Sequence, residues 1–179
     1  MPLRLRLGLA LILLASPCAD AGEHKDPLHE AREVVARFQQ EDPGLRQVFE
    51  DAYGYAVFPT VGKGGLGVGA ARGKGLVYER GAWVGRSTLI QVTIGFQLGG
   101  QAYSEVVFFK NREAFDNFKR GRLKLDAQVS AVALSARAAA DLAWRKGVAI
   151  VTMAKGGLMY EASVGGQKFS FQAVTEAEP

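Results

Sequence analysis

The residues that first suggest chemistry lie in a glycine-rich stretch, Phe58 to Gly75, with the sequence FPTVGKGGLGVGAARGKG. Glycine-rich loops with basic residues often hold phosphate, because backbone N–H groups can closely approach the anion. Residues 62–67 formally satisfy the GxGxxG pattern of dinucleotide-binding proteins, but that site needs a helix directly after the glycines. Val68, Gly69 and Ala70 follow instead, and a helix starts poorly on such a sequence. The pattern therefore predicts no dinucleotide site.

A P-loop is also disfavoured, because Gly73-Lys74 is followed by Gly75 where the motif needs a Ser or Thr to hold the metal ion. The remaining explanation is sheet geometry, since glycine within strands permits sharp coiling and close backbone approach. The sequence KGGL occurs at Lys63–Leu66 and again at Lys155–Leu158. We interpret both copies as hairpins in which Lys-Gly-Gly makes the tight reversal.

Candidates for catalysis and metal binding are sparse. His24 and His29 lie near the start of the chain, and no third ligand has suitable spacing. The GxSxG pattern of a serine nucleophile does not occur. The carboxylates are scattered, as in Glu105, Asp116, Asp126 and Asp141. The sequence therefore predicts a protein that is not an enzyme and has no metal site or cofactor.

Residues 1–21 have the order of features of a secretory signal peptide. Two arginines precede the apolar run Leu7–Ala15, and the small-residue site Ala19–Ala21 follows. We expect cleavage after Ala21 and a periplasmic or secreted product. Cys18 leaves lipidation open as an alternative, although Pro17 before it matches a lipoprotein signal poorly.

The remaining residues, 22–179, suit a single domain. The net charge of the whole chain is +4, which is mildly basic and does not require a nucleic-acid partner. No later apolar run reaches the length that would span a bilayer.

Three helices are expected. Asp26-Pro27 is a typical helix start, and apolar residues at helical spacing predict a helix over 27–40. A shorter helix follows over Leu45 to Asp51. Asn111 caps a third, near 111–120, which Gly121 ends.

The body of the chain, residues 53–172, is rich in β-forming residues punctuated by glycine. Thr88 to Gln97 alternates with a period of two, which predicts a half-buried antiparallel strand. Its apolar face carries Ile90 and Val92, while Leu89 and Gln91 lie on the other. The predicted fold is therefore α+β: a strongly curved, barrel-like antiparallel sheet of glycine-rich hairpins with an N-terminal helix and a second helix near 111–120.

The run from Ala52 to Phe171 resembles the SYLF domain, a lipid-binding module of eukaryotic endocytic adaptors and exported bacterial proteins. The matching segments occur in the family's order: AYGYAVFPTVGKGGLGVG, GKGLVYERGAWVG, STLIQVTIGFQLGGQAYSEVVFF and KGGLMYEASV. The resemblance identifies 22–179 as a single SYLF-like domain. It implies non-enzymatic binding of anionic phospholipid headgroups, with peripheral contact to a membrane surface.

In the family, membrane contact is attributed to an N-terminal amphipathic helix and nearby basic residues. The matching helix here carries many acidic residues, whereas a membrane-surface helix prefers a basic polar face, so we expect it to pack on the sheet. Two basic clusters are the lipid-binding candidates: Lys63, Arg72, Lys74 and Arg86, and then Lys119, Arg120, Arg122 and Lys124. Apolar insertion by Trp83, Leu66 or Leu158 would add affinity.

Two alternatives remain open from the sequence. The curved sheet could serve as a docking surface in an envelope protein-interaction or structural component. A sheet that closes around a hollow interior could instead carry a small apolar ligand.

Overall fold

The computed structural model describes residues 26–66, 68–94, 100–123, 125, 131–155 and 166–174. Within these ranges the chain forms three helices and one sheet of seven strands. In chain order they are α1 (Pro27–Glu41), α2 (Gly44–Asp51), β1 (Gly54–Leu66), β2 (Val68–Glu79), β3 (Ala82–Ile94), β4 (Gly100–Phe109), α3 (Arg112–Lys119), β5 (Val132–Ala133), β6 (Val148–Lys155) and β7 (Lys168–Ala173).

The strands lie in the order β5-β6-β4-β1-β2-β3-β7. Every pairing is antiparallel except that of β5 with β6, which is parallel. The α+β class and the antiparallel sheet are therefore confirmed. In the part of the chain that the structure describes, β5 and β7 are the two edges and do not pair with each other, so barrel-like closure is not confirmed.

The predicted helix starts and stops are confirmed by their caps. The Asp26 side chain accepts a hydrogen bond from the Leu28 amide at 3.0 Å, and Pro27 occupies the first turn. The Asn111 side chain accepts one from the Ala114 amide at 2.9 Å. Gly121 follows α3 with a φ of +65°, which a residue with a side chain rarely adopts.

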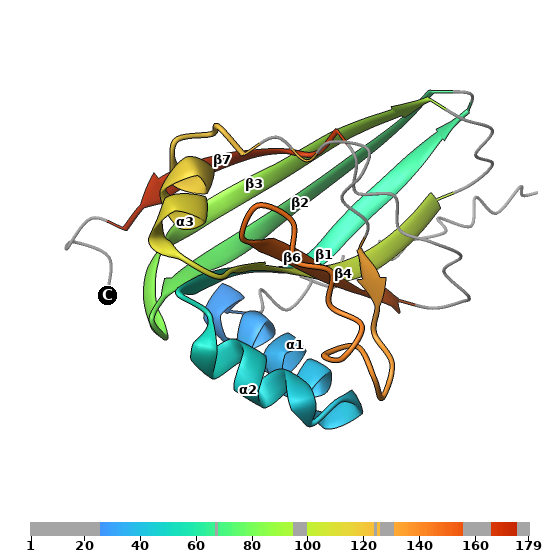
Figure 1. Cartoon of the computed structure of the whole chain (residues 1–179). Coiled ribbons are helices and arrows are strands. Elements are labelled where there is room, and N and C mark those ends of the chain that lie inside the picture. Colours follow the sequence, from blue (N-terminus) through green and yellow to red (C-terminus); the bar gives the residue numbers. More distant parts are fainter. Residues whose placement is uncertain are drawn as a thin grey trace, which may run out of the picture.

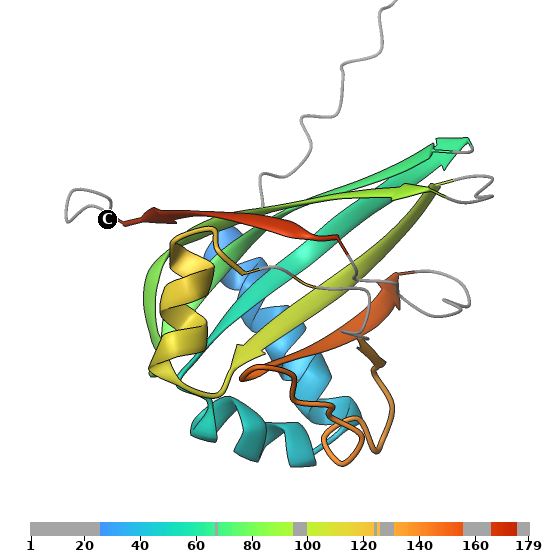
Figure 2. The same ribbon diagram turned by 45° about the horizontal axis from the view of Figure 1, so that its top comes forward.

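The helices cover both faces of the sheet (Figures 1 and 2). On one side, the α1 face, Ala31, Val34 and Phe38 of α1 are buried against strand residues such as Val57 and Val106. On the opposite side, the α3 face, Phe115 and Phe118 pack with residues that include Phe58, Phe109 and Phe169. The apolar stripe of α1 therefore packs on the sheet, as its acidic flanks predict.

The prediction that Lys-Gly-Gly makes the first hairpin reversal is wrong. Residues 63–66 are extended and pair with β2, as in Gly64 opposite Ala70 and Leu66 opposite Val68. The ladder continues to that last pair, so Lys63, Gly64 and Gly65 lie within the strand and do not make the reversal. The strand that follows also confirms that no helix begins after this glycine pattern. The second KGGL copy lies mostly outside the described residues.

Several strand glycines instead allow close packing where the sheet bends. A Cβ at Gly75 would lie 2.6 Å from both the Phe58 ring and the Val57 carbonyl oxygen. A Cβ at Gly73 would lie 2.8 Å from the Val61 side chain. These contacts fall beside a register shift in β1 between Val57 and Thr60, which indicates a bulge.

Helix α1 covers only part of its face. Its 15 residues rise 1.5 Å each and span about 22 Å, whereas the 13 residues of β1 span about 43 Å. Strands β1 to β3 consequently reach well beyond the helix (Figure 1). No helix of the described residues lies over the far part of the α1 face.

We predict that Gly75→Ala lowers the free energy of unfolding by about 1–3 kcal/mol, because the new methyl group overlaps a backbone oxygen and a buried ring. Gly62→Ala is the matched control in the neighbouring strand, since a Cβ there meets nothing within 4 Å. Urea unfolding of both variants measures the difference. Equal stability of the two variants would contradict this role of Gly75.

Candidate functional site

The uncovered part of the α1 face carries cations and exposed apolar side chains. We call this surface the open face and define it by Arg72, Lys74, Arg86, Ile90, Val92 and Lys168. Strand pairing brings these residues together: Arg72 lies opposite Ile90, and Ile90 lies opposite Lys168 on β7. Neighbouring strands lie about 4.8 Å apart, so Ile90 is flanked on both sides by a basic residue.

The apolar face predicted for the strand over 88–97 is exposed rather than buried. Ile90 and Val92 are 50% and 63% exposed, whereas Leu89 and Gln91 are 0% and 1% exposed. The difference arises from what covers each side of β3. Its α3 face packs against side chains such as Phe169, whereas helix α1 does not extend over its α1 face. Large apolar side chains in solvent, next to cations, are typical of a binding surface.

The charge of the open face is uniformly positive among the described residues. Arg72 and Lys74 are exposed, and neither forms an ion pair in the described ranges. The Arg86 guanidinium lies 5.7 Å from the centre of the Trp83 ring. At the border with α1, the Lys155 ammonium donates to the Thr60 hydroxyl at 2.6 Å and lies 3.8 Å from the Glu30 carboxylate.

Three of the four residues in the first predicted cluster thus share this surface. Lys63 does not, because it pairs with Ala71 and Gln101 and therefore lies on the α3 face. The bulge in β1 changes which residues of that strand face each side. Pro59 lies within it and is its sequence signal, because proline in a central strand occurs at bulges. Sequence reasoning also missed Lys168, whose only signal is its place one residue before the buried Phe169.

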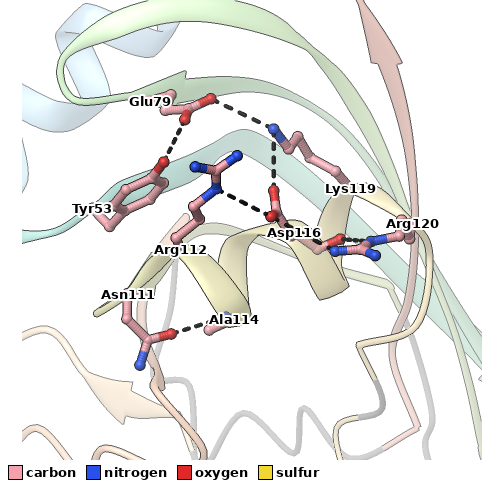
Figure 3. Close-up of polar contacts among 8 residues, drawn as sticks. All are labelled: Tyr53, Glu79, Asn111, Arg112, Ala114, Asp116, Lys119 and Arg120. Carbon is pink, nitrogen blue, oxygen red and sulfur yellow. Dashed lines mark hydrogen bonds and ion pairs between the residues drawn. The ribbon is translucent and has the colours of Figure 1, made fainter.

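The second predicted cluster is held in local ion pairs (Figure 3). The Lys119 ammonium lies 3.5 Å from both Glu79 and Asp116, and Arg120 lies 3.6 Å from Asp116. Glu79 in turn accepts a hydrogen bond from the Tyr53 hydroxyl at 2.8 Å. These acidic partners reduce the field that two of its cations would present to an anion. Arg122 is exposed, and Lys124 lies outside the described residues.

A buried polar group occupies the α3 face. Glu105 on β4 is 0% exposed, and one of its carboxylate oxygens accepts a hydrogen bond from the Gln167 side-chain amide at 2.9 Å. Among the described residues its other oxygen has no hydrogen-bond partner, and neither has the hydroxyl of Thr152, which lies opposite on β6. Burial raises the pKa of Glu105 to about 7.

The hydrogen bond between Glu105 and Gln167 also shows that the sheet is strongly curved. Strands β1, β2 and β3 lie between β4 and β7, so a flat sheet would hold the two ends about 19 Å apart. A bond of 2.9 Å requires the sheet to curl toward α3. The strong curvature predicted from the glycines is therefore present in an open sheet.

The described residues offer little for metal chemistry or membrane spanning. No group of three or more His, Cys, Asp or Glu side chains is placed to hold a metal ion within them. The His29 imidazole lies 3.2 Å from Glu33 on the exposed side of α1. No helix within these ranges is long and apolar enough to cross a bilayer.

Comparison with known proteins matches part of this chain to a family. Residues 90–177 match the profile of the Ysc84 family, described as Las17-binding protein actin regulator, which is the SYLF family. The resemblance to the SYLF family that the motifs predict is therefore confirmed over residues 90–177, and the family is linked to lipid binding and actin regulation.

One protein that this chain is similar to is Beta cell expansion factor A from Aeromonas veronii. It is 28% identical over 139 residues, which cover 76% of this chain and 52% of that protein. The chain therefore spans about half the length of this relative.

We predict that stability depends on pH through Glu105. Its pKa is raised on folding from about 4.5 to about 7, so the folded state binds the proton more tightly. The contribution of Glu105 to the free energy of unfolding is therefore greatest below pH 4.5. This contribution, on the order of 3 kcal/mol, is lost as the pH rises through 7. Urea unfolding at pH 5 and pH 8 measures the loss.

Glu105→Gln is the control, because a neutral amide of similar shape cannot titrate there. The difference in unfolding free energy between pH 5 and pH 8 should be smaller in this variant than in the native chain. An identical pH dependence of both proteins would show that Glu105 keeps an ordinary pKa.

Proposed function

We propose that the protein is a non-enzymatic module that binds anionic phospholipid headgroups through the open face. The observation that carries the proposal is the register of Arg72, Ile90 and Lys168, which sets an exposed apolar side chain between two cations. Cations next to an anionic surface contribute about 1 kcal/mol each, and the apolar side chains can enter the headgroup region. The match to a family linked to lipid binding supports the same proposal.

The two alternatives are less well supported. A carrier with a hollow interior needs a closed sheet, whereas the described α3 face is filled by side chains such as Phe58, Phe109 and Phe118. A protein partner would also suit an exposed surface, and the family description names Las17 binding and actin regulation. The charge of the open face nevertheless favours an anionic partner of high charge density, which a lipid surface provides.

We predict that Arg72→Gln with Lys74→Gln weakens co-sedimentation with anionic vesicles roughly 30-fold at low salt, since two cations are lost. The matched control is Lys119→Gln with Arg120→Gln, which removes the same charge from the ion-paired cluster and should change binding much less. Neutral phosphatidylcholine vesicles should bind weakly throughout. Equal losses in the two double variants would contradict the assignment of the open face.

We further propose that the protein acts outside the cytoplasm, at the periplasmic or extracellular surface of a membrane. The support is the order of features in residues 1–21, which is typical of a signal peptide. Expression of the full chain in a bacterium, followed by mass spectrometry of the product, should give Gly22 as the first residue. A product that begins at Cys18 with an attached lipid, or one that keeps residues 1–21, would contradict cleavage after Ala21.

A further inference from the structure

A groove runs between α1 and the end of the sheet where β2 turns into β3. Its volume is about 420 Å³, within the range of small-molecule sites. Leu28 and Val35 of α1 form one wall, and Tyr55, Tyr78 and Trp83 of three successive strands form the other. All five side chains are only partly buried, so the groove presents apolar and aromatic surface to solvent.

The aromatic wall is preformed by packing. The rings of Tyr55 and Tyr78 stack at 4.9 Å between centres with 20° between their planes. The Trp83 indole N–H donates to the Gly85 carbonyl at 2.8 Å, which fixes the ring. Burial raises the pKa of Tyr78 and raises that of Tyr55 to about 12, so both phenols are neutral at physiological pH.

The charges at the groove favour an anionic ligand. Arg32 is the charged side chain that lines it, and Arg86 lies over the ring of Trp83. No carboxylate of the described part of the chain lines the groove. Asp26 lies near Tyr78, but its side chain caps the first turn of α1. An apolar channel with a cation beside it suits an amphiphile that has a hydrocarbon chain and one negative group.

We infer that this groove binds one acyl chain of an anionic amphiphile, with the negative group beside Arg32. The inference rests on the proposed function and adds a site to it, because Arg86 belongs to the open face and also contacts Trp83, a wall of the groove. One lipid can then place its chain along α1 while its neighbours in the bilayer meet the open face.

Trp83 provides a direct measurement. The chain has two tryptophans, so Trp144→Phe leaves Trp83 as the sole indole. Monomeric 9,10-dibromostearate should quench its fluorescence saturably, because bromine quenches indole on contact, and plain stearate should not quench it. The titration is run below the concentration at which the fatty acid aggregates. Binding to aggregates then does not contribute to the quenching.

Two variants in the Trp144→Phe background locate the ligand. Ala36→Phe fills the groove from an exposed position on α1 and should abolish the quenching. Arg32→Gln should weaken binding about tenfold, while Arg37→Gln, on the same helix but away from the groove, should leave it unchanged. Circular dichroism checks that each variant is folded. Quenching that survives Ala36→Phe, or no saturable quenching at all, would overturn the inference.

Vesicle co-sedimentation separates this inference from the proposed function. If Trp83 is not quenched but anionic vesicles still bind in a manner that depends on Arg72 and Lys74, the groove inference fails and the open face stands. If the fatty acid binds but the vesicles do not, the proposed function fails and the groove is a site for a free amphiphile.

Discussion

The dominant constraint on this molecule is the difference in length between a helix and a strand of similar residue count. Helix α1 has 15 residues and β1 has 13, yet the strand is about twice as long because each extended residue advances more than twice as far. One helix therefore cannot cover the whole face of the sheet. The uncovered part holds Ile90 and Val92 in solvent among cations, and the proposed function depends on that exposure.

The opposite face shows how the sheet keeps its shape without closing. Its strands coil where Gly73 and Gly75 let neighbouring chains approach, and Phe58, Phe109, Phe115 and Phe118 fill the hollow. The curl brings Gln167 over Glu105, and these two polar side chains meet within an apolar layer. A buried carboxyl with a raised pKa is often functional, but this one lies away from the open face, and we assign it a structural role.

Much of the fold could be predicted from local signals. The Asp26-Pro27 start, the Asn111 cap and the stop at Gly121 depend on neighbouring residues, so the sequence alone predicts them. The buried side of β3 could not be predicted, because Leu89 and Ile90 are equally apolar and only the tertiary layers decide which is covered. The side of Lys63 depends on a bulge whose only sequence signal is Pro59, and the number of residues by which the register shifts there appears only in the strand pairing.

Only part of the candidate site could be predicted, because strand register and tertiary packing are not visible in the sequence. Basic residues in a glycine-rich hairpin are visible in the sequence, but their grouping by face needs strand register. Register joins Arg72 to Lys168 across 96 positions of chain and separates both from Lys63. The ion pairs of Lys119 and Arg120 with Asp116 follow from helical spacing, whereas the pair of Lys119 with Glu79 appears only once α3 is placed against the end of β2.

The proposed function requires that the open face, and not the α3 side, meets the anionic surface. Spin labels at Val92→Cys and at Glu113→Cys, an exposed position on α3, test this directly by collision with a water-soluble nickel complex. Residues 22–179 contain no other cysteine. Adding anionic vesicles should shield the label at position 92 from the complex and leave the label at position 113 accessible. Shielding of position 113 alone, or of neither position while the protein is bound, would contradict the account.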